Sequence, residues 1–316
     1  MLTVAVIPCY KSKEKAAEVA LLTLNYVDKV ICVDDNCPYK TYNFLIKKIK
    51  NDNLIIIRNN RNLGVGGAFK EGLKAALDMG ADNIIKIDSD GQMKPELIPL
   101  FIKPLVEKKA LFVKGNRFRN SEVINKMPKV RLYGNIFLSF LTKISTGYWE
   151  LFDPTNGFIA FKKELINQIP LHKLDNRFFF ETDLLFRIGL LETFIIEIPI
   201  QAVYENEKSN LNSIREIPNF FIKHLNLILK RILYSYFLFD FNPGSLFLVI
   251  SIFFSFGSLS LASYYSIYSN INRIATPVGI QTLFLALFFI GLQFFINFIH
   301  FDISQKPLIR MVKNII

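Results

Sequence analysis

The chain has 316 residues, of which 51% are hydrophobic, and it carries a formal net charge of +11 at pH 7. That length holds one large domain or two domains of ordinary size. The basic residues are dispersed and match no sequence pattern of a nucleic-acid-binding module, which excludes a nucleic-acid partner and leaves anionic lipids and nucleotides to account for the charge.

The N-terminal part of the chain alternates between strand and helix patterns. Short apolar runs predict strands at residues 2–10, 29–36, 53–59 and 83–91. One lysine, Lys86, interrupts the last of these runs. Apolar residues at helical spacing predict helices at 13–27, 41–50 and 66–80, and the glycines at the start of the third helix let it lie close to a sheet. Strands separated by such helices form a parallel sheet, which binds its ligands at the carboxyl ends of the strands.

Two carboxylates and an amide lie at the end of the fourth strand, in the segment Asp88-Ser89-Asp90-Gly91-Gln92. In extended backbone, side chains two residues apart point to the same side, so Asp88, Asp90 and Gln92 offer oxygen ligands toward one point. Such oxygen sets suit Mg²⁺ or Mn²⁺. The alternative is an Asp/Gly turn that only ends the strand. Polar residues also lie at the carboxyl ends of the neighbouring strands. Because these ends meet at one edge of the sheet, the arrangement favours a metal site.

Two charge-free runs occupy the C-terminal third, between Asp240 and Arg273 and between Arg273 and Asp302. Each holds about 20 strongly apolar positions, which is the length that crosses a bilayer as a helix. We therefore expect membrane spans at about 245–267 and 278–299; a buried core helix is the alternative. Because basic residues are abundant before and after these runs but not between them, we predict a multi-pass protein of the cell (inner) membrane with a cytoplasmic N-terminal domain.

Residues 213–240 show the pattern of a helix that lies in the membrane interface, with a core helix as the alternative. Its apolar stripe consists of Ile217, Phe221, Leu225, Ile228 and Ile232. We thus predict three parts. These are a catalytic domain at 1–212, amphipathic interfacial helices at 213–240, and two transmembrane helices with a short basic cytoplasmic tail at 241–316.

Seven motifs occur in an order that identifies a resemblance: "IPCYK", "VDDNCPYKT", "NNRNLGVGGAFKEGL", "IDSDGQMKPE", "GNRF", "DPTNGF" and "FFFETDLLFRI". Over about residues 3–240, the chain resembles family 2 glycosyltransferases, and most closely the membrane-anchored dolichol-phosphate and polyprenyl-phosphate glycosyltransferases. The resemblance implies an α/β protein with the GT-A fold, which is the nucleotide-diphospho-sugar transferase fold with a Rossmann-like mixed sheet. It also implies a UDP- or GDP-sugar donor, Mg²⁺ or Mn²⁺, and inverting transfer to polyprenyl (undecaprenyl) phosphate at the cytoplasmic face. It does not decide whether the protein forms a homo-oligomer.

The resemblance also implies roles for individual residues on the donor side. The metal ligands would be Asp88, Asp90 and Gln92, where the cation neutralises the charge that grows on the leaving nucleoside diphosphate. Asp90 would be catalytic in this sense. The nucleotide-sugar would be bound by Pro8, Tyr10, Val33, Asp35, Asp88, Ser89 and Lys208.

On the acceptor side, Arg117 and Arg131 match basic residues that grip the acceptor's phosphate in the related enzymes. A guanidinium suits this role because it offers a two-point fork to phosphate oxygens. Asp183 is the further catalytic candidate, although Asp153 and Glu181 are carboxylates of the same motifs. A lipid phosphate needs no strong base, since a phosphate monoester loses its second proton near pH 6.

One position departs from the related enzymes. Ala202 stands where they carry an arginine, which puts the binding of the donor diphosphate there in doubt, and Lys208 is the candidate to supply the missing charge. Two rival functions stay open at this point. The first is sugar transfer by the same fold to a hydroxyl group of a growing polysaccharide or glycolipid. The second is a catalytically silent membrane scaffold that only binds nucleotide-sugar.

Overall fold

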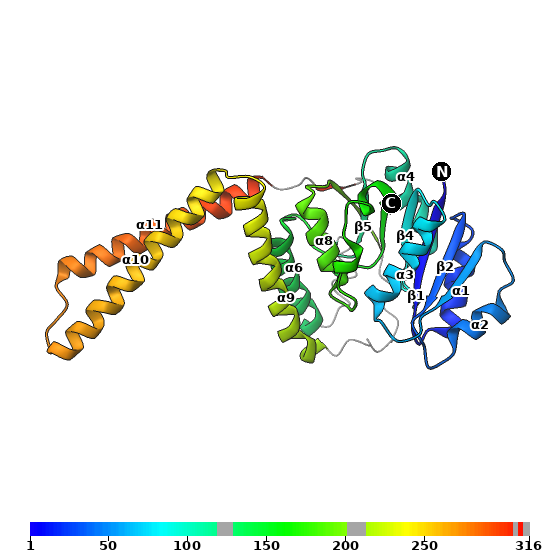
Figure 1. The fold of residues 1–316 in the computed structure, drawn as a ribbon, viewed down its shortest axis with the longest axis horizontal. Coiled ribbons are helices and arrows are strands. Elements are labelled where there is room, and N and C mark those ends of the chain that lie inside the picture. Colours follow the sequence, from blue (N-terminus) through cyan, green and yellow to red (C-terminus); the bar gives the residue numbers. More distant parts are fainter. Residues whose placement is uncertain (119–128, 201–212, 306–308, 312–316) are drawn as a thin grey trace. The chain divides into compact units, whose positions relative to one another are not determined.

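The structure is a computed structural model that describes residues 1–118, 129–200, 213–305 and 309–311 (Figure 1). It contains two compact units. The first comprises residues 1–228 with 307–316, and the second comprises residues 229–306. The division falls inside a helix that the sequence assigns wholly to an interfacial segment, and residues 309–311 belong to the first unit.

Within the described residues, eight strands form one sheet in the order β3-β2-β1-β4-β6-β5-β7-β8. The pairs among β1, β2, β3 and β4 are parallel, as the sequence predicts, whereas β6 is antiparallel to both β4 and β5. The result is the mixed sheet that we expected. The strands are β1 (Thr3–Cys9), β2 (Lys29–Asp34), β3 (Leu54–Arg58), β4 (Asn83–Lys86), β5 (Phe112–Asn116), β6 (Ile159–Lys162), β7 (Ile195–Pro199) and β8 (Ile309–Met311).

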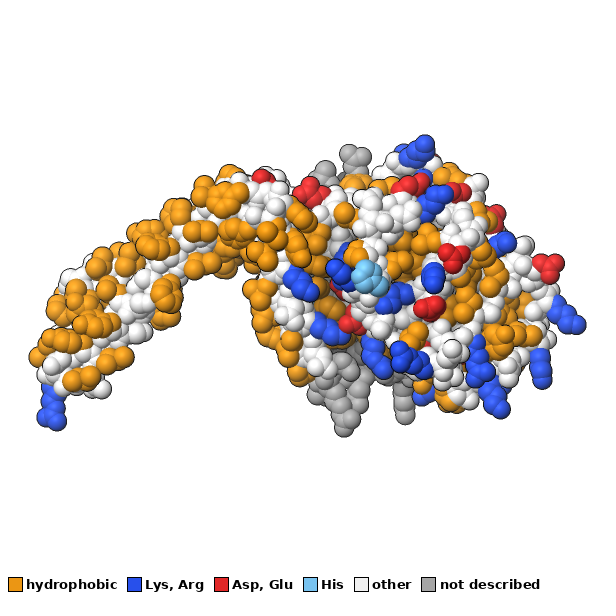
Figure 2. Space-filling view, viewed as in Figure 1, with side chains coloured by type: hydrophobic (Ala, Val, Ile, Leu, Met, Phe, Trp, Pro, Cys, Tyr) orange, Lys and Arg blue, Asp and Glu red, His pale blue; other side chains and the backbone are white. Residues whose placement is uncertain are grey.

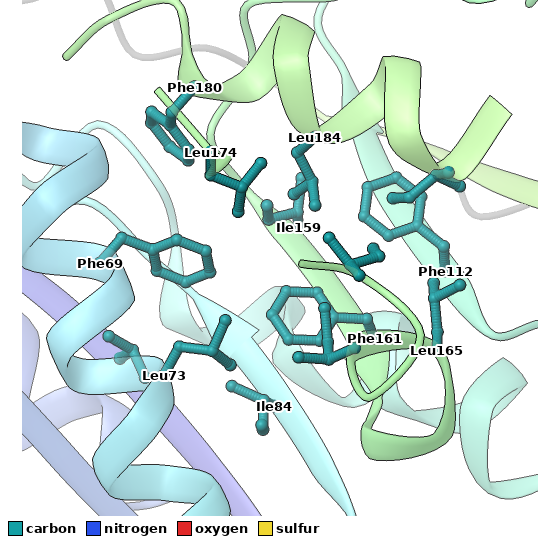
Figure 3. Packing of buried hydrophobic residues seen from close by; sticks show 14 of the residues in the cluster. Phe69, Leu73, Ile84, Phe112, Ile159, Phe161, Leu165, Leu174, Phe180 and Leu184 are labelled. Carbon is teal, nitrogen blue, oxygen red and sulfur yellow. The ribbon is translucent and has the colours of Figure 1, made fainter. Parts of the chain in front are cut away.

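Helices cover both faces of this sheet. One core cluster joins it to α1 (Lys13–Thr23), α2 (Thr41–Lys48) and α4 (Ile98–Val106). The other cluster, shown in Figure 3, joins it to α3 (Val65–Asp78) and α8 (Phe180–Leu190). The remaining short helices are η1 (Pro95–Leu97), α7 (Lys163–Ile166) and η2 (Leu171–Lys173). Both clusters stop at the carboxyl ends of β1, β2 and β4, where the polar motif residues begin.

Glycine lets α3 lie directly on the sheet, as we inferred from the sequence. A Cβ atom at Gly72 would overlap the side chain of Val6 on β1 and would come within 2.9 Å of Val33 on β2. A larger residue at position 72 would therefore push α3 away from the sheet.

Helix α9 (Ser213–Leu233) packs on α6 (Lys129–Thr146) and α8 through one face (Figure 1). His224 is buried, lies 3.0 Å from Ser145 Oγ through Nδ1, and stacks edge-on against Phe179. Burial lowers the pKa of His224 to about 4, so this histidine is neutral at pH 7. Phe221 and Leu225 of the predicted stripe are exposed, whereas Leu227 is buried against Phe179 and Phe186. The helix thus carries a core face as well as the predicted apolar outer face.

The second unit is a helical hairpin of α10 (Pro243–Asn272) and α11 (Val278–Ser304), preceded by a π-helical turn, η3 (Tyr234–Leu238). By length and composition, both helices could cross a membrane, and they contain the two predicted spans. Hydrophobic side chains cover the visible face of the hairpin (Figure 2). At its base, the Arg231 guanidinium donates to both carboxylate oxygens of Asp302, at 2.7 and 2.9 Å.

Candidate functional site

The motif Asp88-Ser89-Asp90-Gly91-Gln92 forms a turn beyond the end of β4. Gly91 has a φ of +79°, and the Gln92 N–H donates to Asp90 Oδ1 at 3.0 Å. We predicted extended backbone from Asp88 to Gly91, whereas the Asp90 side chain closes a turn with the backbone two residues on. Ser89 Oγ lies 2.7 Å from Ser12 Oγ and so ties the turn to the loop after β1.

Beneath the turn lies a group of buried charges. Lys86, the last residue of β4, is fully buried, and its Nζ donates to Asp88 Oδ1 at 2.5 Å and to the Gly157 carbonyl at 3.3 Å. Glu181, in the first turn of α8, lies 3.7 Å from the same Nζ through Oε1. Burial raises the pKa of Glu181 to about 7, against the opposing effect of Lys86 and Lys114.

Arg117, just after β5, faces a buried carboxylate of the "DPTNGF" motif. Its Nε and Nη2 atoms donate to Asp153 Oδ2 and Oδ1 at 2.8 and 2.7 Å, and its backbone N–H donates to Oδ2 at 2.9 Å. Asp153 is fully buried; burial alone would raise its pKa, but Arg117 holds it below the usual value. On β5, Lys114 donates to the Asn156 carbonyl, and burial lowers the pKa of this lysine to about 8. Three cations therefore hold the segment 153–157.

Four of the residues assigned to the nucleotide, namely Pro8, Tyr10, Val33 and Asp35, lie at the ends of β1 and β2. Pro8 and Val33 are buried and face each other in the β1–β2 register, while Tyr10 is exposed. Asp35 is buried, and its carboxylate accepts hydrogen bonds from Asn59 Nδ2 and from the backbone N–H groups of residues 63 and 64 at 2.7–2.8 Å. Tyr10 is thus accessible to a ligand, whereas Asp35 closes the loop between β3 and α3.

Asp183 lies in a different set of contacts from Glu181. Its carboxylate accepts the backbone N–H of Asp175 at 2.9 Å and pairs with Arg187 at 3.1 Å. These contacts fasten the loop before α8 to the helix. Of the two acidic residues in "ETD", Glu181 is the one beside Lys86 and the Asp88 turn, whereas Asp183 pairs with Arg187.

A cavity of about 190 Å³ adjoins the turn on the side of α1. Its lining includes Asp90, Gly91, Met93, Lys94 and Lys15. Asp90 is half-buried there, so its carboxylate stands at the border between the protein interior and an open space.

The turn offers an oxygen donor set to a cation. Among the residues that the structure describes, no group of three or more His, Cys, Asp or Glu side chains is arranged to hold a metal. The candidate ligands in this turn are the oxygens of Asp88, Asp90 and Gln92, of a kind that hard cations prefer. Lys86 pairs with one oxygen of Asp88, and one oxygen of Asp90 accepts the Gln92 N–H.

Some assigned residues lie outside the described part of the chain. Ala202 and Lys208 fall in 201–212, and Arg131 lies on α6 with a side chain that is not described. Lys86 was not assigned a role from the sequence. The signal for it was present, since a charged residue inside a buried strand requires a partner.

Comparison with known proteins assigns the chain to a family. Residues 4–169 match the sequence profile of the family described as Glycosyl transferase family 2. The chain is 30% identical over 215 residues to a UDP-N-acetylglucosamine–dolichyl-phosphate N-acetylglucosaminyltransferase of Methanococcus voltae, covering 63% of this chain and 84% of the relative. It is 27% identical over 176 residues to an undecaprenyl-phosphate mannosyltransferase of Micrococcus luteus, covering 55% and 71% of the two chains.

A solved structure supports the fold. The chain is similar to glucosyl-3-phosphoglycerate synthase of Mycobacterium tuberculosis in complex with Mn²⁺ and UDP-glucose, with a TM-score of 0.54 and 18% identity. The similarity covers 73% of this chain and 78% of that one. At this level of identity the likeness concerns the fold alone.

Proposed function

Because this chain belongs to glycosyl transferase family 2 and has the GT-A fold, we propose that it transfers a sugar from a nucleotide-sugar to polyprenyl phosphate. The observation that carries this proposal is the turn Asp88–Gln92 at the carboxyl edge of the sheet, with Arg117 after strand β5. Two similar proteins of the family are named for lipid-phosphate acceptors. UDP- or GDP-sugars are the donors that we propose.

The proposed chemistry is a single displacement at the anomeric carbon. An oxygen of the acceptor phosphate forms the new bond to that carbon while the bond to the donor's phosphate breaks, which inverts the configuration. The acceptor oxygen is already ionised near neutral pH, so no protein group has to remove a proton. What the protein supplies is orientation and charge compensation.

The donor would lie across the ends of β1, β2 and β4. Tyr10 is accessible for stacking on the base, and Asp35 would act indirectly by holding the loop before α3. Asp90, with Gln92 and the outer side of Asp88, would hold Mg²⁺ or Mn²⁺. When bound there, the cation would neutralise the charge that develops on the leaving diphosphate.

The proposal is tested by analysis of the product. Membranes that contain the full chain are incubated with radiolabelled nucleotide-sugars, undecaprenyl phosphate and Mg²⁺ or Mn²⁺. We expect label in a prenyl-linked product that mild acid releases, because a sugar-phosphate ester is labile to acid. Label that is recovered only in an acid-stable lipid or polymer would refute the phosphate acceptor.

One observation favours a second candidate, transfer to a sugar hydroxyl. Such an acceptor needs a base, and a buried carboxyl group whose pKa is raised to about 7 is suited to remove a proton at neutral pH. Glu181 is that group. Under this alternative the same product analysis gives the acid-stable label.

The membrane location rests on three apolar surfaces. Helices α10 and α11 could span a bilayer. In the first unit, two helices joined by the Ser145–His224 contact expose large apolar side chains, namely Tyr133, Ile136, Phe137 and Phe140 on α6 and Phe221, Ile222 and Leu225 on α9. We propose that these outer faces lie in the interface of the inner membrane, on its cytoplasmic side.

Cysteine labelling tests this topology. The three native cysteines are buried and should react slowly, while Ile274, between α10 and α11, is exposed. We expect an Ile274→Cys variant to react with a membrane-impermeant maleimide in intact cells. The control variant Lys47→Cys, on the exposed side of α2, should react only after the membrane is opened. The reverse pattern would contradict the proposed orientation.

A further inference from the structure

Lys86 is a charged residue in the buried interior of the sheet, where most residues are apolar. It lies on a central strand of the sheet, between β1 and β6, and none of its surface is exposed. Its predecessor on the same face, Ile84, belongs to the core cluster of α3 and α8. Burying an ammonium group is costly unless carboxylates compensate it, so its contacts indicate what the charge is for.

Three groups converge on the Lys86 ammonium. Asp88 Oδ1 is 2.5 Å away, Glu181 Oε1 is 3.7 Å away, and the Gly157 carbonyl accepts a hydrogen bond at 3.3 Å. Position 157 has room only for glycine. A Cβ there would lie 2.7 Å from Glu181 Oε1 and 2.9 Å from Asp88 Oδ2, and it would overlap Lys86 Nζ. One internal cation is thus shared between two carboxylates at the edge of the proposed metal site.

We propose that Lys86 is a positioning residue that serves as an internal counter-cation. It holds Asp88 and Glu181 and keeps a divalent cation from binding between these two carboxylates, so that the metal binds at Asp90, Gln92 and the outer oxygen of Asp88, together with the nucleotide. This inference rests on the proposed metal-dependent function. Asp90 lies two residues beyond Asp88 on the same turn and borders the cavity beside α1, where the diphosphate oxygens can complete a coordination sphere.

Charge substitution separates this role from a merely structural one. In Lys86→Met the two carboxylates lose their shared cation, and we expect Mn²⁺ without nucleotide to bind at least about tenfold more tightly, since an ammonium within a few ångströms repels a divalent cation strongly. In Glu181→Gln the lysine keeps its charge and loses one carboxylate. Binding of Mn²⁺ in the presence of UDP should then weaken by about threefold or more.

The measurement is titration of Mn²⁺ by electron paramagnetic resonance, on the full chain in detergent, alone and with UDP or GDP. The matched control is Lys162→Met, which removes another buried lysine, on β6 opposite Asn83 at the amino end of β4, and should not create nucleotide-independent Mn²⁺ binding. The double variant Lys86→Met/Glu181→Gln should return to weak binding. Thermal unfolding shows whether each variant is folded.

Tighter Mn²⁺ binding in Lys86→Met together with weaker Mn²⁺ binding in Glu181→Gln supports the proposal. Weakening in both variants would overturn it, because that is the result of damage to the structure. If Lys86→Met does not fold, an unchanged or tighter Mn²⁺–UDP affinity in Glu181→Gln overturns it instead. Absence of Mn²⁺ binding to the unaltered protein with either nucleotide would refute the proposed metal dependence itself, which is a distinguishable result.

Discussion

Replacing Asp90 by asparagine is expected to lower the rate of sugar transfer by about three orders of magnitude, because the charge stabilisation supplied by a bound metal is worth several kcal/mol and each 1.4 kcal/mol is tenfold. The fold should survive. Asparagine retains the oxygen that accepts the Gln92 N–H, so the turn at Gly91 can still close. The measurement is turnover at saturating donor and acceptor with Mg²⁺ or Mn²⁺, alongside thermal unfolding.

Two controls accompany this variant. Asp52→Asn removes an acidic residue from an exposed turn before β3 and should leave turnover unchanged. Excess EDTA should abolish the activity of the unaltered enzyme, and added Mn²⁺ should restore it. Full activity in EDTA, or an Asp90→Asn enzyme with ordinary turnover, would contradict the metal-dependent mechanism.

The second large effect is expected at Arg117. If its guanidinium grips the acceptor phosphate, Arg117→Ala should weaken acceptor use by about ten- to more than a hundredfold, since a hydrogen bond to a charged group contributes roughly 1.5–3 kcal/mol. Donor affinity should change little. Arg117→Lys should recover only part of the loss, because an ammonium keeps the charge but not the two-point fork.

The pairing of Arg117 with Asp153 affects the outcome of this test. The fork of Arg117 already binds Asp153, which is fully buried, so Arg117→Ala also leaves a buried carboxylate without its cation. Breaking such a pair costs about 3–5 kcal/mol of stability. A fall in thermal stability is therefore expected for Arg117→Ala under either role, and stability alone does not distinguish them.

Asp153→Asn makes the distinction. Asparagine keeps an oxygen for Arg117 but removes the competing charge, so a phosphate-gripping arginine should bind the acceptor as well as before or more tightly. If Arg117 only clamps the segment 153–157, Asp153→Asn and Arg117→Ala should instead impair the enzyme in the same way. The readout is the acceptor KM against kcat in one prenyl-phosphate assay. The hydroxyl-acceptor alternative predicts a further pattern, in which Glu181→Gln abolishes turnover and the arginine matters little.

Much of the architecture follows from local patterns in the chain. The first four strands and their connecting helices could be predicted because apolar periodicity reflects which side of each element is buried. The two C-terminal helices could be predicted because a long charge-free run has few other stable solutions. The polar segment Asp88–Gln92 was recognisable from its residue types, although its backbone is a turn and not an extended strand.

The sequence did not determine which distant groups meet. Glu181 and Asp183 are two residues apart on α8, and side chains at that spacing on a helix do not face each other. Only the packing of α8 on the sheet turns Glu181 toward Lys86 and leaves Asp183 with Asp175 and Arg187.

The sequence also did not determine which segment completes the edge of the sheet or which buried charges pair. Residues 309–311 pair with β7 as a parallel strand, although the sequence predicts a basic tail there, because β7 presents unpaired backbone groups that local patterns do not reveal. By itself, the sequence determined the first four strands, the helices between them, the apolar spans and the residue types at the sheet's carboxyl edge, since each depends on neighbours within a few residues. The tertiary structure decided that Lys86 serves both Asp88 and Glu181 and that Arg117 faces Asp153, since burial makes each of these charges depend on a partner from another part of the chain.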